Sequence, residues 1–288
     1  MAEWMSLSDA IRAAIHDGDL VALEGFTHLI PFAAAHEIIR QGRRNLSLVR
    51  MTPDLIYDQM IGAGCVARLT FSWGGNPGVG SLHRFRDAVE HAWPGPLALE
   101  ERSHSDLANA YVAGAANLPL AVLRGYTGSD FLRSAAHIRT ITCPFTGEAL
   151  AATPAVRPDV TIIHAQKADY KGNVLLWGIL GVQKEAVLAA RHAIVTVEER
   201  VEHLDAPPNA CVLPHWILDA VCHVPRGATP SYAHGYYDRD NAFYRRWDEI
   251  SRTRDSFIAW IQDHVLDTAD FAEYLRVLAD SARQAAHP

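Results

Sequence analysis

The sequence predicts an α/β protein built on an open, mostly parallel sheet with helices on both faces, a more strand-rich second half and a helical C-terminus. Three observations predict this class. Short apolar runs alternate with amphipathic segments through the first 116 residues. These runs are apolar along their whole length, which is typical of strands covered on both faces. Beyond residue 238 the pattern is helical.

The first half holds the clearest elements. Ser6 precedes residues 7–16, in which Leu7, Ile11 and Ile15 recur every four positions, so we expect a capped helix with one apolar face. Strands are predicted at residues 20–23, 46–51, 66–73 and 97–100, and helices after Pro31, after Thr52-Pro53, at 81–92 with Ser81 as the cap, and at 106–116.

The second half is richer in strands. They are predicted at residues 120–123, 140–145, 160–165, 174–177, 193–197 and 211–213, with a helix at 181–191. From residue 238 we expect two helices separated near 266–269. No internal repeat or low-complexity linker is visible, so residues 1–288 are expected to form a single α/β domain with a helical extension over about 238–285.

Composition and charge exclude several classes of protein. Of the 288 residues, 49% are hydrophobic and 20% are charged, which is typical of a globular protein. The formal net charge of −7 argues against nucleic-acid binding. There is no basic leader and no apolar stretch of roughly 20 residues, so neither a secretory signal nor a membrane span is predicted, and a cytoplasmic location is expected. Cysteines and histidines lack metal-binding spacing, so no metal site is predicted.

The first candidate segment of a functional site follows the strand at 20–23. Gly25, Phe26 and Thr27 lie between the end of this strand and a helix. Open α/β sheets bind ligands beyond the carboxyl ends of their strands, and exposed backbone N–H groups there favour anions. An ordinary strand-to-helix turn explains the same residues, and it is the better interpretation of this segment taken alone.

The second candidate is the glycine-rich loop at residues 72–81. Its bare backbone is suited to a nest of N–H donors for a phosphate, carboxylate or thioester oxygen. A nucleotide site is not favoured, because no P-loop lysine follows and position 83 is His where a dinucleotide fingerprint has glycine. A flexible loop without a ligand is the alternative. The candidate substrate contacts are Ser72, Asn76, Gly78, Val79 and Gly80.

The third candidate is a pair of carboxylates near the end of the strand at 97–100. Glu100 and Glu101 should point to opposite faces of an extended segment, so one of them can face a cleft. With Ser103 and His104 nearby, Glu101 is the candidate catalytic carboxylate, as a base, a nucleophile or an orienting group. The simpler alternative is that Ser103 or Ser105 caps the next helix, whose positive N-terminus favours the glutamates.

The fourth candidate is the aromatic loop at residues 227–238, which contains Tyr232 and Tyr237 together with glycine and proline. Loops rich in tyrosine often form binding surfaces. For each of these two tyrosines, packing over the edge of the core is the favoured interpretation.

Together these segments resemble the A subunit of family I CoA transferases, which carries an Asp-Gly, a short apolar strand, Gly-Gly-Phe and then Gly-x-Pro. Here Asp17-Gly18 leads to Gly25-Phe26 and Pro31. The sequence departs from the pattern twice, with Glu24 for the first glycine and Leu29 for the glycine before the proline. Similarity to the glutaconate CoA-transferase branch is carried by residues 74–81, 101–104, 164–173 and 227–238.

This resemblance implies a CoA-transferase-like fold and an enzyme that moves coenzyme A between an acyl-CoA and a carboxylic acid. The CoA thioester is then a substrate, and no cofactor is permanently bound. The resemblance places the nucleophilic glutamate in a homologous B subunit. No second copy of the fold follows residue 250, so a heterodimer or heterotetramer is expected. This chain would supply backbone donors and acid-binding groups across the interface between the two subunits.

Two other functions stay open at this point. The same branch also resembles CoA-ester hydrolases and decarboxylases, in which Glu101 would be the working carboxylate. The second is a non-enzymatic effector-binding domain on a similar fold. The lack of a helix-turn-helix extension and of a basic face argues against it.

Overall fold

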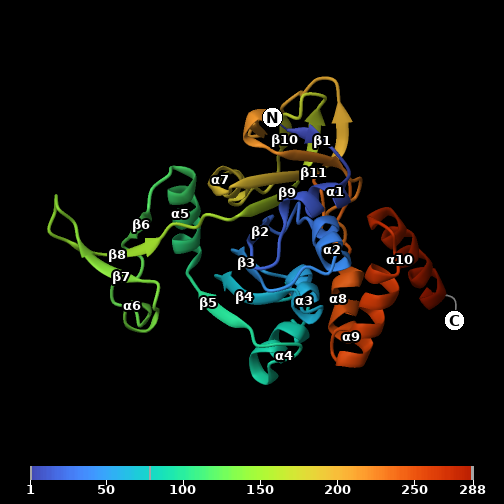
Figure 1. The fold of residues 1–288 in the computed structure, drawn as a ribbon, viewed down its shortest axis with the longest axis horizontal. Coiled ribbons are helices and arrows are strands. Elements are labelled where there is room, and N and C mark those ends of the chain that lie inside the picture. Colours follow the sequence, from blue (N-terminus) through green and yellow to red (C-terminus); the bar gives the residue numbers. More distant parts are fainter. Residues whose placement is uncertain (1, 78, 287–288) are drawn as a thin grey trace.

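The computed structural model describes residues 2–77 and 79–286, and a large sheet forms its centre (Figure 1). The main path of the sheet is β1–β13–β11–β9–β2–β3–β4–β5, and neighbouring strands on this path are parallel. Strands β10 and β12 add antiparallel pairs beside β9. The predicted mostly parallel sheet is therefore confirmed. Its strands are β1 Glu3–Trp4, β2 Leu20–Glu24, β3 Leu46–Arg50, β4 Val66–Phe71, β5 Ala98–Glu101, β9 Val160–Asp169, β10 Val174–Leu176, β11 His192–Val201, β12 Cys211–Leu213 and β13 Ala220–His223.

Helices cover both faces of this sheet, as predicted. On one face α1, α2, α3 and the C-terminal helices pack on Val21 and Leu23 of β2. On the other face α5 and α7 pack on Ala22 of β2 and Val49 of β3. Successive residues of a strand point to opposite faces, so β2 must be apolar along most of its length. The helices are α1 Leu7–Ala14, α2 Phe32–Arg40, α3 Leu55–Gly62, α4 His83–His91, α5 His104–Ala115, α7 Gln183–Ala189, α8 Asn241–Ile250, α9 Arg254–Ile261 and α10 Phe271–Ala286, with a 3-10 turn at His215–Ile217 and a π turn at Gln262–Leu266.

Residues 120–154 form a separate antiparallel sheet, here called the arm, which projects from the body (Figure 1). It consists of β6 (Leu120–Leu123), β7 (Arg139–Thr142) and β8 (Ala149–Pro154), in the order β6–β8–β7, with the short helix α6 (Phe131–Ser134). Sequence reasoning missed β8, because its alanine-rich run has neither strong β propensity nor alternation. The arm has a small core made by Leu123, Tyr126, Ile138 and Ala151.

Several predicted boundaries change. Ser6 does cap α1, since its hydroxyl accepts the N–H of Asp9 at 3.1 Å. Ser81 caps nothing: α4 begins at His83, and the N–H of Ser81 instead donates to Asp248 at 2.9 Å. The segment beyond residue 238 contains three α-helices in its described part, not two, because Thr253 caps a new helix after α8.

Candidate functional site

The carboxyl ends of β2, β3, β4 and β5 meet at one edge of the sheet, and hydrogen bonds connect them in sequence. The guanidinium of Arg50 donates to the carbonyl of Gly25 at 2.8 Å. The hydroxyl of Ser72 donates to the carbonyl of Met51 at 2.7 Å. The N–H of Arg102 donates to the carbonyl of Phe71 at 2.8 Å. The structure therefore brings the first three predicted segments to a common edge, as parallel strand order requires.

The turn after β2 has a backbone that only glycine permits at its first position. A Cβ atom on Gly25 would lie 2.6 Å from the carbonyl oxygen of Leu29. Thr27 and Leu29 both adopt left-handed backbone conformations, with φ of 58° and 55°. Leu29 thus takes a conformation that favours glycine, and its full burial in the core offsets the strain. Phe26 is half-buried and Thr27 is exposed beside the turn.

Glu24 replaces a glycine of the family pattern, and it is the centre of a buried polar network beneath this turn. Its carboxyl accepts a hydrogen bond of 2.8 Å from the hydroxyl of Tyr111. Burial raises the pKa of Glu24 to about 7, although Arg50, Tyr111 and backbone N–H groups lower it. Arg50 also pairs with Asp54 at 3.3 Å, and Tyr244 of α8 donates to the other oxygen of Asp54. The network connects the turn to α3, α5 and α8.

A second buried cluster lies where β9 and β11 pass the end of β2. His164 contacts Glu198 at 2.6 Å, and the hydroxyl of Tyr237 donates to the same carboxylate at 2.5 Å. Burial raises the pKa of Glu198, but the hydrogen bonds from His164, Tyr237 and the N–H of Arg226 outweigh it and leave this pKa below its usual value. Tyr237 of the aromatic loop is therefore a packed, hydrogen-bonded residue, as favoured from the sequence.

His28 is fully buried beside this cluster, next to Tyr232. Neither of its ring nitrogens has a hydrogen-bond partner in the described part of the chain. Burial lowers the pKa of His28 to about 4, so the ring is neutral near pH 7. Glu24 and His28 lie in the first candidate segment, but the sequence assigned no role to them or to Arg50, His164 and Glu198. The available signal was charged or polar residues within otherwise apolar strands, which points to paired burial.

The glycine-rich loop is held by α8. The side chain of Asn76 is buried and donates to the carbonyl of Tyr244 at 2.9 Å. Gly80 has φ of 132°, and a Cβ there would lie 2.4 Å from the carboxylate of Asp248. Val79 packs partly against the main core. Gly78 lies outside the described residues. The packing of Asp248 therefore favours glycine at position 80 whether or not the loop binds a ligand.

The end of β5 separates the two glutamates as predicted. Glu100 pairs with Arg102 at 2.8 Å, whereas Glu101 is exposed and forms no hydrogen bond or ion pair with the described residues. Ser103 caps α5, since its hydroxyl accepts the N–H of Asp106 at 3.1 Å. His104 is the exposed first residue of that helix.

Among the described residues, no group of His, Cys, Asp and Glu could hold a metal ion, and no helix is long and apolar enough to cross a membrane.

Comparisons with known proteins agree with this geometry. The family model for coenzyme A transferase matches residues 4–223. The A subunit of 3-oxoadipate CoA-transferase from Pseudomonas knackmussii is 66% identical over 280 residues, which cover 97% of this chain and 99% of that protein. The A subunit of glutaconate CoA-transferase from Acidaminococcus fermentans is 34% identical over 298 residues, which cover 96% of this chain and 92% of that protein.

Solved structures give the same result. A crystal structure of glutaconate coenzyme A-transferase from Acidaminococcus fermentans aligns with a TM-score of 0.89 at 32% identity, covering 96% of this chain and 93% of that chain. A variant of the decarboxylase AibA/AibB aligns with a TM-score of 0.76 at 29% identity, covering 91% of this chain and 98% of that chain.

This chain belongs to the coenzyme A transferase family. Within it the chain corresponds to the A subunit of the two-subunit enzymes, and its activity is the transfer of coenzyme A.

Proposed function

We propose that this chain, joined to a B subunit, transfers coenzyme A from an acyl-CoA to 3-oxoadipate or a closely similar dicarboxylic acid. The observation that carries this proposal is the 66% identity to the A subunit of a 3-oxoadipate CoA-transferase, over 97% of the chain. The second transferase relative is named for glutaconate, which is also a dicarboxylic acid. Both relatives are A subunits by name, which supports a second, different subunit in the working enzyme.

In the proposed reaction a glutamate of the B subunit uses its carboxylate to attack the thioester carbonyl, and CoA leaves as its thiolate. The thiolate attacks the glutamyl carbonyl of the mixed anhydride and releases the first acid as a carboxylate. The acceptor acid then attacks the enzyme thioester, and the steps run in reverse. Each attack places negative charge on a carbonyl oxygen, which positioned N–H donors stabilise.

This chain would contribute those donors and orient the acid. The backbone of the turn at Gly25, Phe26 and Thr27 is held in one conformation by Arg50, so its exposed groups are preorganised. Ser72 and the loop to which Gly78 and Gly80 belong in the sequence follow strand β4, which β3 separates from β2. We assign Glu101, Ser103 and His104 to substrate or partner orientation, because they are exposed or half-exposed at the sheet edge.

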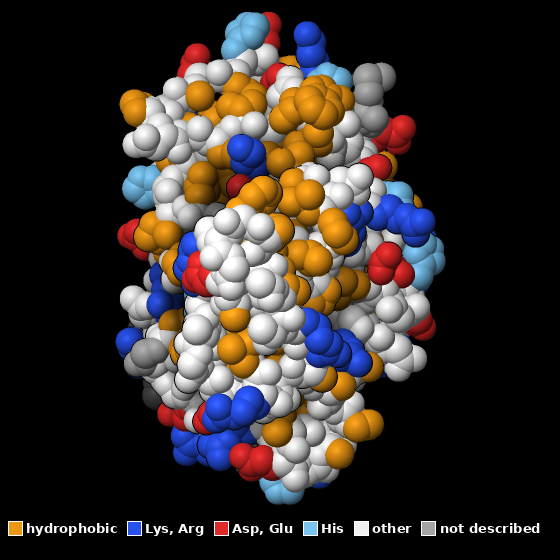
Figure 2. Space-filling view, turned by 90° about the vertical axis from the view of Figure 1, so that its left-hand side faces the viewer, with side chains coloured by type: hydrophobic (Ala, Val, Ile, Leu, Met, Phe, Trp, Pro, Cys, Tyr) orange, Lys and Arg blue, Asp and Glu red, His pale blue; other side chains and the backbone are white. Residues whose placement is uncertain are grey.

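The surface around this edge is suited to a protein partner. Strand β5 ends the sheet path, and Leu99 is 41% exposed on it. The arm presents Leu120, Val122 and Phe145 to solvent, the last with 93% of its surface exposed. Figure 2 looks onto the side from which the arm projects and shows hydrophobic side chains gathered there. Exposed apolar surface of this kind marks an interaction site.

The decisive experiment is to trap the covalent intermediate. The chain is purified with its B subunit, mixed with 3-oxoadipyl-CoA, treated with borohydride and analysed by intact mass. We expect a modified glutamate on the B subunit but none on this chain. Glu101→Gln should keep the adduct and lower turnover only partly. An unmodified B subunit together with an inactive Glu101→Gln variant would overturn the proposal in favour of hydrolysis or decarboxylation, since losing a general base costs roughly 10²–10⁴-fold.

A further inference from the structure

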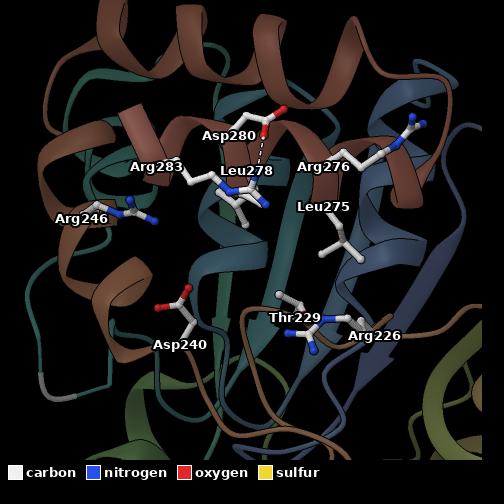
Figure 3. Close-up of a pocket in the computed structure, with 10 residues that line it drawn as sticks. Arg226, Thr229, Asp240, Arg246, Leu275, Arg276, Leu278, Asp280 and Arg283 are labelled. Carbon is white, nitrogen blue, oxygen red and sulfur yellow. Dashed lines mark ion pairs between the residues drawn. The ribbon is translucent and has the colours of Figure 1, made fainter. Parts of the chain in front are cut away.

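A cavity of about 600 Å³ lies between α10, the start of α8 and the loop that follows β13 (Figure 3). Its lining includes four arginines: Arg226 from the loop, Arg246 from α8, and Arg276 and Arg283 from α10. Its volume is within the range of small-molecule sites. None of its lining residues lies at the ends of β2, β3, β4 and β5, although the backbone N–H of Arg226 donates to Glu198 of the second buried cluster.

Most of these arginines have no acidic partner. Arg283 lies 3.6 Å from Asp280, but no carboxylate of the described residues lies within 4.0 Å of the guanidinium of Arg226, Arg246 or Arg276. Arg226 is held in place by stacking on the ring of Tyr237, at 4.6 Å. The Nε atom of Arg246 is buried and has no hydrogen-bond partner among the described residues. The cavity therefore presents three arginines without a carboxylate partner among the described residues, and the Nε of one of them, Arg246, is buried without an acceptor.

A second arginine-rich hollow, between α4 and the start of α9, shows the contrast. There Arg84 and Arg254 both bind Asp87, at 2.9 and 2.8 Å, and Arg86 binds Glu90 at 3.1 Å. Those charges are neutralised within the chain. The cavity at α10 has a similar composition but a different pairing. Arg226, Arg276 and Arg283 are exposed there, whereas the Nε of Arg246 is a buried donor, and burial of such a donor is unfavourable unless something binds it.

Two further residues point to an oxygen-bearing ligand. Thr229 lines the cavity and is only 6% exposed, yet its hydroxyl has no hydrogen-bond partner in the described part of the chain. Asp240, the nearest acidic residue on α8, is occupied as the cap of that helix, because it accepts the N–H of Phe243 at 2.8 Å. The hydroxyl of Thr229 and the guanidinium groups of Arg226, Arg246 and Arg276 therefore remain available for a ligand.

We propose that this cavity binds a small dianion with two carboxylate groups joined by a short aliphatic chain. Four arginines against two aspartates leave two positive charges, which a dianion neutralises. Leu275 and Leu278 lie between the arginines in Figure 3 and supply an apolar surface for the chain. Arginine matches carboxylate geometry with two parallel hydrogen bonds. The inference does not depend on the proposed function, because it concerns binding away from the catalytic edge.

Isothermal titration calorimetry tests this proposal. The full chain is titrated together with its B subunit, in a buffer free of phosphate and carboxylates. Adipate is the probe, and hexanoate, with one carboxylate, is the comparison. Wild type should bind one more adipate per chain than the double variant Arg246→Gln/Arg276→Gln, or bind it at least about tenfold more tightly. Hexanoate should bind at least about tenfold more weakly than adipate. The control Arg86→Gln/Arg254→Gln, in the neutralised hollow, should match wild type.

Adipate binding that is equal in wild type and in the double variant would overturn the proposal. So would binding of inorganic pyrophosphate in place of adipate, because the aliphatic chain would then have no role. If the double variant does not fold, Arg276→Gln alone decides the matter, since Arg276 is an exposed side chain whose replacement leaves the core unchanged.

Discussion

The turn after β2 is closed by contacts within this chain, whereas the end of β5 and the arm are open to solvent. Gly25 is held by Arg50, and Glu24, beneath it, is buried with Tyr111. Glu101 lies on β5, which β3 and β4 separate from β2, and it touches no described side chain through a hydrogen bond or ion pair. The difference indicates that folding of this chain alone fixes the turn after β2, whereas the end of β5 and the arm need a partner to cover them.

The isolated chain should have no CoA-transferase activity, and adding the B subunit should restore it. The reason is that the open side lacks the nucleophilic glutamate that the proposed reaction requires. Transfer of CoA from 3-oxoadipyl-CoA to a second acid is measured for each protein separately and for the mixture. Full turnover by this chain alone would contradict the inference that a partner must complete the site.

Gly25→Ala should destabilise the fold and remove most activity. The new methyl group would lie 2.6 Å from a backbone oxygen that cannot move without changing the turn. We expect a loss of about 3 kcal/mol in unfolding free energy, measured by urea denaturation. Gly95→Ala is the matched control, because a Cβ there has no atom within 4 Å. Equal stability of the two variants would show that the turn after β2 tolerates a side chain at position 25.

Glu24 should make stability depend on pH. Its pKa is raised by burial from an ordinary value of 4.5 to about 7, so the folded state binds the proton more tightly than the unfolded state. Its contribution to stability is therefore greatest below about pH 4.5 and declines as pH rises towards about 7.

Glu24→Gln cannot ionise, so its unfolding free energy relative to wild type should increase by about 3 kcal/mol across that window. Urea denaturation at a series of pH values measures this. The exposed Glu101→Gln serves as the control and should follow wild type. Parallel pH profiles for Glu24→Gln and wild type would show that the network does not hold the proton.

Tyr126→Phe should loosen the attachment of the arm to α5 with the smallest of these effects. The hydroxyl of Tyr126 donates to Asp106 at 2.9 Å and accepts the N–H of Ser103 at 2.8 Å. Its removal should cost about 1–2 kcal/mol locally. Hydrogen exchange at Ser103 and in the arm should accelerate. Ser129→Ala, which removes a hydroxyl from the same loop without touching α5, should leave exchange at Ser103 unchanged.

The parallel sheet, the helices around it and the segments at the strand ends were predictable from the chain. Apolar periodicity is a local property, so β2 and the α1 cap could be placed within a few residues. The glycine motifs indicated the family, which the comparisons confirm. The particular roles of Glu101, Ser103 and His104 stay predictions, because exposed side chains take their function from what binds them.

The pairings of polar residues were decided by tertiary structure. Arg50 reaches a carbonyl 25 positions away, and His164 meets Glu198 34 positions away. Such contacts depend on strand order and register, which no local pattern encodes. The same is true of Gly80, whose partner Asp248 comes from α8. Periodicity determines which residues are buried, but only the assembled tertiary structure determines which charged groups pair with one another.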